Sequence, residues 1–251
     1  MTSEKATAIV LRVVPFSETS SIVTLFSREF GKLRAIAKGA RRLKGPFESA
    51  LDLLARCRVV FRPKPSDVLD LLTEAKLERR FRPFGRDLDS LYAGYYVAEL
   101  LLELTDENDP HPELFDLADV VLDRLARGGS VPALVLRFEL VALRILGHLP
   151  AFERCVECGA AVGNQPRVAF GPWAGGVLCP DCRTGKRHVV SVSAGVLGTL
   201  GRYADTARGW CDEESDCAGS GELRAVMNHY LSHLVGHKLR MHASMETTRG
   251  V

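Results

Sequence analysis

An α+β fold is predicted by three features of this chain: a strand-like first third, a largely helical remainder, and four cysteines grouped in two pairs. Residues 1–80 contain short β-branched and apolar segments in which polar and apolar side chains alternate, as they do in half-buried strands. From residue 83 the apolar side chains recur every three to four positions, which is typical of amphipathic helices. Both cysteine pairs fall within the helical part, so they indicate a module inserted into it.

Five strands account for the first third of the chain. They are predicted at residues 7–13, 21–26, 32–38, 53–61 and 68–75. Five strands of this length suit a small closed β-barrel such as the OB-fold. A basic loop at residues 39–46 joins the third strand to the fourth.

Five helices are predicted after the barrel. The first follows Pro83, and the others are expected at residues 113–125, 132–146, 193–207 and 222–241. Gly128 and Gly129 end the second helix, and Pro132 suits the first turn of the third.

The four cysteines have the spacing of a structural zinc ribbon. Cys155 and Cys158 form one C-x-x-C pair, Cys179 and Cys182 form the other, and 20 residues separate the pairs. Each pair can reach one ion from a tight turn, and four thiolates complete a tetrahedron around Zn²⁺. Because no coordination position stays open, the predicted ion is structural and not catalytic. Two disulfides are the alternative, and they would need an oxidising compartment.

A cytoplasmic location is expected. The first ten residues, MTSEKATAIV, lack the basic segment and apolar core of a secretory signal. The most apolar stretch, residues 131–146, is interrupted by Arg137, Glu139 and Arg144, so no transmembrane helix is predicted. Reduced thiols in the cytoplasm favour zinc. Of the other cysteines, Cys57 is expected in the core, and Cys211 and Cys217 flank an acidic loop without a complete ligand set.

We therefore expect an α+β protein of four segments. Residues 1–82 form an OB-fold nucleic-acid-binding domain, and residues 83–150 form the first part of a helical domain. Residues 151–189 form the zinc-binding module, and residues 190–251 hold the rest of the helical domain and a C-terminal tail.

Charge is distributed unevenly, although the net charge is only +2. Residues 1–80 carry 16 Lys and Arg against 9 Asp and Glu, whereas residues 81–150 carry 6 against 12. A basic barrel beside an acidic helical segment favours binding of a polyanion by the barrel. The candidate nucleic-acid-binding residues lie in the third strand and the basic loop, and they are Arg34, Lys38, Arg41, Arg42 and Lys44.

Three phenylalanines lie close to these cations in the sequence: Phe16, Phe26 and Phe30. Aromatic rings beside a cationic groove can stack on the bases of single-stranded nucleic acid. Taken singly, each ring is more often part of a core.

Catalytic motifs are not found in the sequence. His229, His233 and His237 share a helix face, but the Glu of the H-E-x-x-H motif is missing, so a wet or interface face is the better interpretation. His111-Pro112-Glu113 lacks the P-C-x-x-C partner of the zinc deaminases. Neither a P-loop nor a G-x-S-x-G elbow is present. We expect neither enzymatic activity nor a small-molecule substrate.

The order of these parts resembles the bacterial RecO family of recombination mediators. The resemblance is carried by ETSSIVTLFS at residues 18–27, GKL at 31–33, KGARR at 38–42 and the two C-x-x-C pairs, and it covers nearly the whole chain. It implies an OB-fold that binds single- and double-stranded DNA, a helical domain and a zinc module. Under it, Arg34, Lys38, Arg41, Arg42 and Lys44 are DNA-contact candidates, and the four cysteines are zinc ligands.

The resemblance also implies a role in DNA repair and recombination without catalysis. Members anneal complementary strands and, together with RecR and sometimes RecF, help RecA load onto DNA coated by the single-strand-binding protein SSB. Such a protein is expected at the nucleoid. Two other classes stay open: a zinc-ribbon transcription or RNA-binding factor without mediator activity, and a metal-dependent enzyme acting on nucleic acid. The second needs clustered carboxylates or an open metal site.

Overall fold

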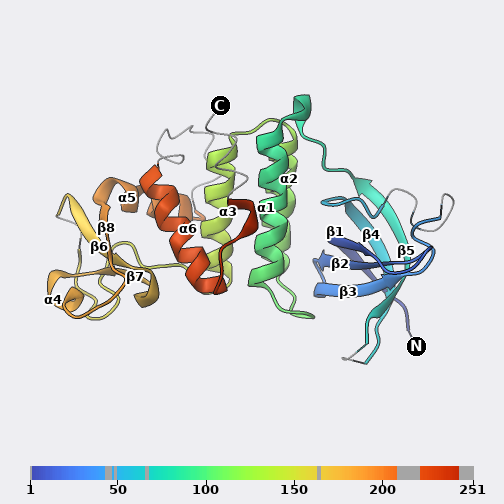
Figure 1. The fold of residues 1–251 in the computed structure, drawn as a ribbon, viewed down its shortest axis with the longest axis horizontal. Coiled ribbons are helices and arrows are strands. Elements are labelled where there is room, and N and C mark those ends of the chain that lie inside the picture. Colours follow the sequence, from blue (N-terminus) through green and yellow to red (C-terminus); the bar gives the residue numbers. More distant parts are fainter. Residues whose placement is uncertain are drawn as a thin grey trace. The chain divides into compact units, whose positions relative to one another are not determined.

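The computed structural model describes residues 2–42, 47, 50–65, 68–162, 165–207 and 221–242 and divides into two compact units. Unit 1 runs up to Gly129 and unit 2 begins at Ser130. Unit 1 holds the strands of the N-terminal third and two helices, whereas unit 2 holds the remaining described helices and a small sheet (Figure 1). The two C-x-x-C pairs lie in unit 2. The finer division expected at residues 82, 150 and 189 stays a prediction.

A closed barrel of five strands forms the N-terminal part of unit 1, which confirms the predicted OB-fold. Its strands are β1 (Glu4–Pro15), β2 (Ser21–Ser27), β3 (Gly31–Ala37), β4 (Arg56–Arg62) and β5 (Asp70–Arg79). Their order is β1-β2-β3-β5-β4, and β4 pairs back onto β1 to close the barrel. All neighbours are antiparallel except β3 and β5.

The alternation of polar and apolar side chains in the sequence matches the alternation of exposed and buried side chains in the strands. In β3, Leu33 and Ala35 are buried in the barrel core, whereas Arg34 between them is exposed. Cys57 of β4 is fully buried in the same core, as predicted, and burial raises the pKa of its thiol to about 12. At neutral pH this thiol therefore stays protonated in the barrel core.

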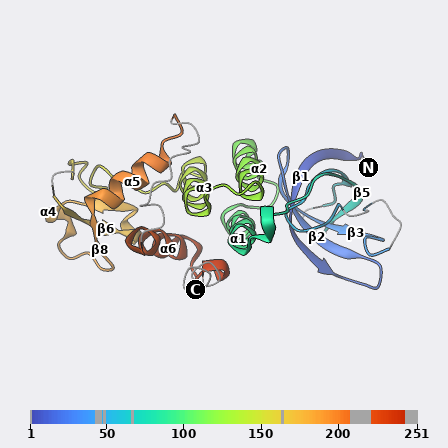
Figure 2. The same ribbon diagram turned by 90° about the horizontal axis from the view of Figure 1, so that it is seen from above.

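Two helices follow the barrel in unit 1: α1 (Leu88–Leu104) and α2 (Pro112–Ala126), with a short 3-10 turn η1 (Phe84–Arg86) before them (Figures 1 and 2). The Asp87 side chain caps α1 by accepting from the N–H groups of Asp89 and Ser90. A Cβ at Gly94 would lie 2.7 Å from the Phe81 ring, so glycine permits this close approach.

The described part of unit 2 contains three longer helices and a small sheet. Its elements are α3 (Val131–Ile145), β6 (Arg167–Gly171), η2 (Pro172–Ala174), β7 (Gly176–Leu178), α4 (Pro180–Arg183), β8 (Val190–Ser193), α5 (Ala194–Ala204) and α6 (Gly221–Val235). The strands pair antiparallel in the order β7-β6-β8. The sequence did not predict this sheet or α4. The helix predicted to residue 241 ends at Val235, where Gly236 adopts a φ of +83° that breaks the helix.

The charged residues that interrupt α3 form polar contacts with other elements of unit 2. Glu139, 1 % exposed, forms a bidentate ion pair with Arg224 of α6, with both N–O distances at 2.8 Å. Arg144 Nε donates to the Ala204 carbonyl at the end of α5, where helix carbonyls lack internal partners. None of the helices among the described residues has the length and apolar character needed to span a bilayer.

Candidate nucleic-acid interface and metal centre

The basic loop, taken here to include Lys38 directly after β3, is described up to Arg42, and this part folds against the turn between β1 and β2. The Arg41 N–H donates to the Thr19 carbonyl at 3.1 Å, and Arg41 Nη1 donates to the Ser17 carbonyl at 3.0 Å. Gly39 adopts a φ of +81°, and its carbonyl accepts from the Arg42 N–H at 3.1 Å. These bonds place the cationic loop and the β1–β2 turn at the same edge of the barrel.

Three candidate cations lie in this loop, and their charged groups are accessible to a ligand. Lys38, Arg41 and Arg42 are exposed, and none of them forms an ion pair with any described residue. Lys44 lies outside the described residues. A solvated cationic loop without carboxylate partners can receive phosphate groups at little cost, because no existing ion pair must break.

An exposed aromatic ring stands in the adjoining turn. Phe16 follows β1 and is 61 % exposed, while its N–H donates to the Ser20 carbonyl at 3.0 Å. The other two rings serve the fold: Phe26 is fully buried, and Phe30 packs edge-on against Phe61 at 5.3 Å. Of the three phenylalanines, Phe16 is therefore the one whose ring is available for a nucleic-acid base to stack on.

Arg34 lies apart from the loop, in the middle of β3. Its Nη1 donates to Glu107 Oε1 at 3.3 Å, in the segment that joins α1 to α2. This segment runs beside β3, because the Asn108 N–H donates to the Lys32 carbonyl at 3.0 Å. A Cβ at Gly31 would lie 2.0 Å from the Asp109 carbonyl oxygen, so only glycine fits there. The sequence showed no signal for this pairing.

Lys32 is a cation of β3 that the structure withdraws from solvent. Its ammonium donates to the Leu102 carbonyl at 2.7 Å and to the Thr105 carbonyl. Burial lowers the pKa of Lys32 from its ordinary value, while the nearby Asp106 and Glu107 oppose that shift. Lys32 therefore fixes the α1–α2 segment on the barrel.

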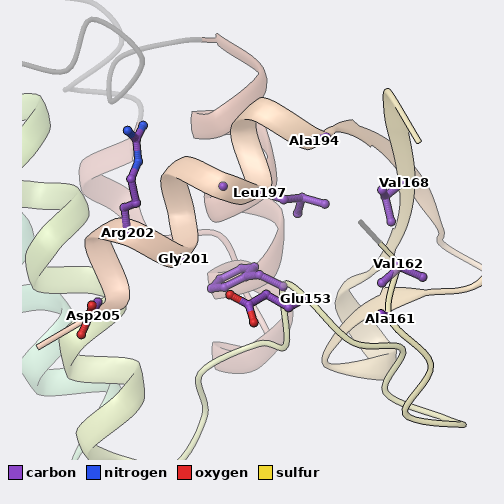
Figure 3. A pocket seen from close by; sticks show the side chains of 11 residues that line it. Glu153, Ala161, Val162, Val168, Ala194, Leu197, Gly201, Arg202 and Asp205 are labelled. Atoms are coloured by element: carbon purple, nitrogen blue, oxygen red, sulfur yellow. The ribbon is translucent and has the colours of Figure 1, made fainter. Parts of the chain in front are cut away.

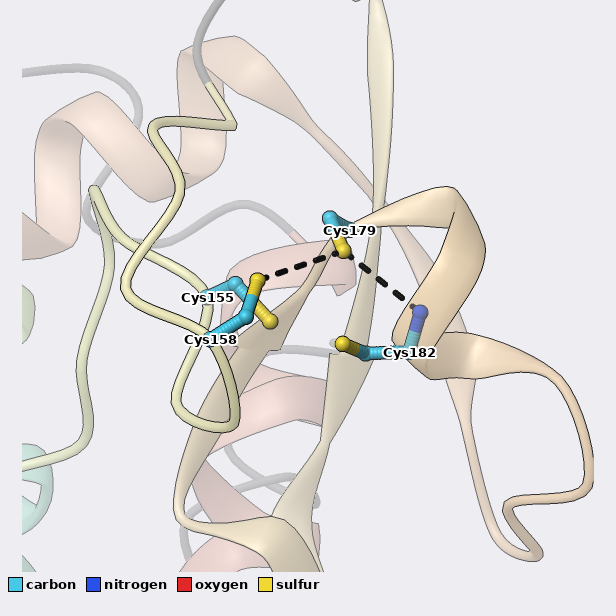
Figure 4. Close-up of side chains that lie close together, drawn as sticks. All are labelled: Cys155, Cys158, Cys179 and Cys182. Atoms are coloured by element: carbon cyan, nitrogen blue, oxygen red, sulfur yellow. Dashed lines mark hydrogen bonds between the residues drawn. The ribbon is translucent and has the colours of Figure 1, made fainter.

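The four predicted ligands converge in unit 2. The sulfur atoms of Cys155, Cys158, Cys179 and Cys182 all lie within 4.8 Å of one another (Figure 4). Cys158 Sγ and Cys179 Sγ are 3.7 Å apart, and the Cys182 N–H donates to Cys179 Sγ at 3.5 Å. Four sulfurs at this separation can surround one metal ion as a tetrahedral shell.

Tight turns hold each pair in place. The Gly159 N–H donates to the Cys155 carbonyl at 2.8 Å, and Gly159 adopts a φ of +74°. The Arg183 N–H donates to the Cys179 carbonyl at 3.0 Å. Gly176 lets β7 approach the first pair, since a Cβ there would lie 2.5 Å from the Ala151 carbonyl oxygen. Two sequence-distant turns therefore face each other across the cluster.

The thiols do not ionise alike. Hydrogen bonds from backbone N–H groups, led by that of Cys179, lower the pKa of Cys155 to about 6. Hydrogen bonds with the sulfurs of Cys179 and Cys158 raise the pKa of Cys182 to about 12. Four thiolates cannot share so small a volume without a cation among them, so the donor set fits a bound metal ion.

The remaining candidate residues do not join the cysteine cluster where the structure describes them. Among the described residues, the four cysteines are the only group of three or more His, Cys, Asp or Glu side chains close enough to share an ion. His233 of α6 stacks on Trp173, whereas His237 lies beyond the end of the helix. Cys211 and Cys217 lie outside the described residues.

We call residues 151–193, which hold the two C-x-x-C pairs and β6, β7 and β8, the cysteine module. A hollow of about 390 Å³ lies between α5 and this module (Figure 3). Val162, Val168 and Leu197 form apolar walls, and the Arg202 side chain points away from them. Glu153 and Asp205 are its acidic lining residues. This mostly apolar lining offers no pair of groups arranged for acid–base chemistry.

Comparison with known proteins covers both units. The N-terminal family model of recombination protein O matches residues 1–81, and the C-terminal model matches residues 85–242. The DNA repair protein RecO of Rhodopirellula baltica is 49 % identical over 198 residues, which are 78 % of this chain and 73 % of the relative. The DNA repair protein RecO of Anaeromyxobacter dehalogenans is 35 % identical over 240 residues, which are 95 % of this chain and 94 % of the relative. The chain therefore belongs to the RecO family of DNA repair proteins.

Proposed function

We propose that this chain is a recombination mediator that binds single- and double-stranded DNA and anneals complementary strands. In this role it acts with RecR to help RecA load onto single-stranded DNA coated by SSB. The observation that carries the proposal is the basic loop on the barrel, where Lys38, Arg41 and Arg42 have no ion-pair partners among the described residues and stand beside the exposed ring of Phe16. Membership of the RecO family supports it.

The mechanism needs no catalytic group. Two single strands repel each other through their phosphates, and a cationic surface that binds both lowers this repulsion by releasing counterions. Lys38, Arg41 and Arg42 would neutralise phosphates without regard to sequence, and Phe16 would stack on an unpaired base. We therefore propose that the protein is not an enzyme, and that it acts in the cytoplasm at the nucleoid, where its DNA substrate lies.

We also propose that the cysteine cluster holds one structural Zn²⁺. All four thiolates would serve as ligands, which leaves no position for an activated water. The ion would supply the cross-link that joins the two turns and would take no part in annealing. This assignment follows from the sulfur donor set, because soft thiolates in tetrahedral groups of four select zinc or iron–sulfur centres.

The test is annealing of two complementary oligonucleotides that have each been coated with SSB. Acceleration by the wild-type protein, together with its loss when Lys38, Arg41 and Arg42 are all changed to alanine, is the expected result. Absence of acceleration, despite retained binding to uncoated DNA, would contradict the mediator proposal. Preference for RNA or for one DNA sequence would instead favour a zinc-ribbon transcription or RNA-binding factor.

A further inference from the structure

Three exposed rings stack on one another in unit 2. Trp173 of η2 lies 4.1 Å from the ring of His188, with an angle of 25° between the planes. The ring of His233 on α6 lies 5.2 Å from Trp173, at 18°. We call these three side chains the ring stack. The ring stack joins the cysteine module to α6, because His188 lies 15 residues and His233 lies 60 residues after Trp173 in the sequence.

The ring stack is not part of a core. Trp173 is 59 % exposed, and both histidines are exposed as well. Indole is the largest aromatic side chain, and its burial normally contributes strongly to stability. Because Trp173 and both histidines remain exposed while they stack, the three rings together offer aromatic surface to a ligand.

The backbone at His188 supports a specific role for this arrangement. His188 adopts a φ of +57°, which is uncommon for residues other than glycine. A non-glycine residue in this region is strained, and such residues cluster at ligand-binding sites. Here the unusual conformation accompanies a stacking contact with Trp173.

Positive charge adjoins the rings. The segment that links the last cysteine to His188 is exposed and contains Arg183, Lys186 and Arg187. Lys186 pairs with Glu157 at 2.6 Å. Within the described part of the chain, neither Arg183 nor Arg187 has a carboxylate partner. Arg187 directly precedes His188, and Arg183 lies five residues before it in the same exposed segment. Guanidinium groups on the segment that leads into the stacked rings are complementary to a ligand that carries both flat rings and negative charge.

We propose that the ring stack, with Arg183 and Arg187, is a second contact for single-stranded nucleic acid, in unit 2 and separate from the barrel. Stacking of a base on exposed aromatic rings, with phosphates held by neighbouring arginines, is the common chemistry of single-strand binding without sequence preference. The inference rests on the proposed function, because it assigns a second binding surface to the same single-stranded ligand. An acidic peptide is the competing ligand, but its carboxylates would use the arginines and leave the ring stack without a partner.

The chain contains two tryptophans, Trp173 and Trp210, so Trp210→Phe leaves Trp173 as the sole indole. We would titrate this full-length, zinc-loaded variant at low salt with a fluorescein-labelled deoxythymidine oligonucleotide. The anisotropy of the label reports total binding, whereas an unlabelled copy of the oligonucleotide reports on indole emission. The expected result is quenching of Trp173 emission in parallel with binding.

Substitutions of Trp173 in the same background then measure how much stacking contributes to the affinity for the oligonucleotide. Trp173→Ala should weaken binding about 5-fold or more, which is the loss of one stacked base, and Trp173→Phe should restore most of it. His229→Ala is the matched control, because this exposed histidine lies one turn earlier on α6 and outside the ring stack. Metal content and melting temperature would be compared first, so that only folded variants are interpreted.

Unchanged Trp173 emission while anisotropy shows saturation would overturn this inference and leave the proposed function standing. Failure of the oligonucleotide to bind at all would overturn both. Quenching by a poly-glutamate peptide without quenching by the oligonucleotide would assign the ring stack to a protein partner and so also reject the inference.

Discussion

Arg34 of β3 donates to Glu107 of the α1–α2 segment at 3.3 Å, across 73 residues of sequence. Both side chains are half exposed, at 51 % and 46 %. An ion pair in such an environment contributes about 1 kcal/mol or less to stability. A phosphate group can therefore compete with Glu107 for the guanidinium, and under the proposed function this carboxylate would limit the cationic surface of β3.

Glu107→Gln is predicted to increase affinity for single-stranded DNA. The substitution frees Arg34 and removes one negative charge beside it, so binding at low salt should tighten about 2- to 5-fold, given the modest strength of exposed ion pairs. Fluorescence anisotropy with a short oligonucleotide measures the change. Glu113→Gln, which removes an exposed charge from the first turn of α2, is the matched control for net charge. A gain that persists when Arg34 is also changed to alanine would show that this pair is not its source.

The basic loop should dominate the salt dependence of binding. Each phosphate contact to single-stranded DNA contributes about 0.7 to the slope of log affinity against log salt concentration. Replacing Lys38, Arg41 and Arg42 by alanine should therefore reduce the slope by about 2. The double variant Lys5→Ala and Lys76→Ala is the control. It removes two exposed cations that lie in β1 and β5, away from the β1–β2 turn, and it should change the slope less. Equal slopes for the triple variant and the wild type would contradict the placement of the site in this loop.

Metal retention should depend on each cysteine of the cluster. Cys155→Ser removes the thiol whose pKa is lowered to about 6 and leaves three ligands, so metal content should fall and unit 2 should unfold at lower denaturant concentration. Metal content is measured by release into a chromogenic chelator. Cys57→Ala is the control, because this buried thiol belongs to the barrel core, and the variant should keep its metal. Full metal content in Cys155→Ser would reject the four-cysteine site.

The barrel and the metal ligands could be predicted because their signals are local. Alternation of burial along β3 and the C-x-x-C spacing depend on neighbouring residues, and both patterns survive in the structure. The three strands of the cysteine module were missed because they are only three to five residues long. Such strands lack the length over which a period-2 pattern can be recognised.

Long-range polar contacts were not predictable. In the sequence Arg34 is a cation without an evident partner, but the fold places Glu107 beside it. Glu139 interrupts an apolar helix in the sequence, and its partner Arg224 lies 85 residues further along the chain. The ring stack likewise forms from three separate elements. Sequence patterns describe which face of an element is apolar, but the partner of one charged or aromatic side chain is fixed only by tertiary structure.

The buried ion pair between Glu139 and Arg224 leads to a prediction about stability. The side chain of Glu139 is fully buried and that of Arg224 is 13 % exposed, so removal of either partner leaves a desolvated charge. Glu139→Ala should therefore destabilise unit 2 by about 3–5 kcal/mol, measured by urea denaturation followed by circular dichroism. The double change Glu139→Leu and Arg224→Met replaces both charges with apolar groups of similar size and should cost much less. A double variant as unstable as the sum of both single variants would show that the two side chains stabilise the unit independently of their pairing.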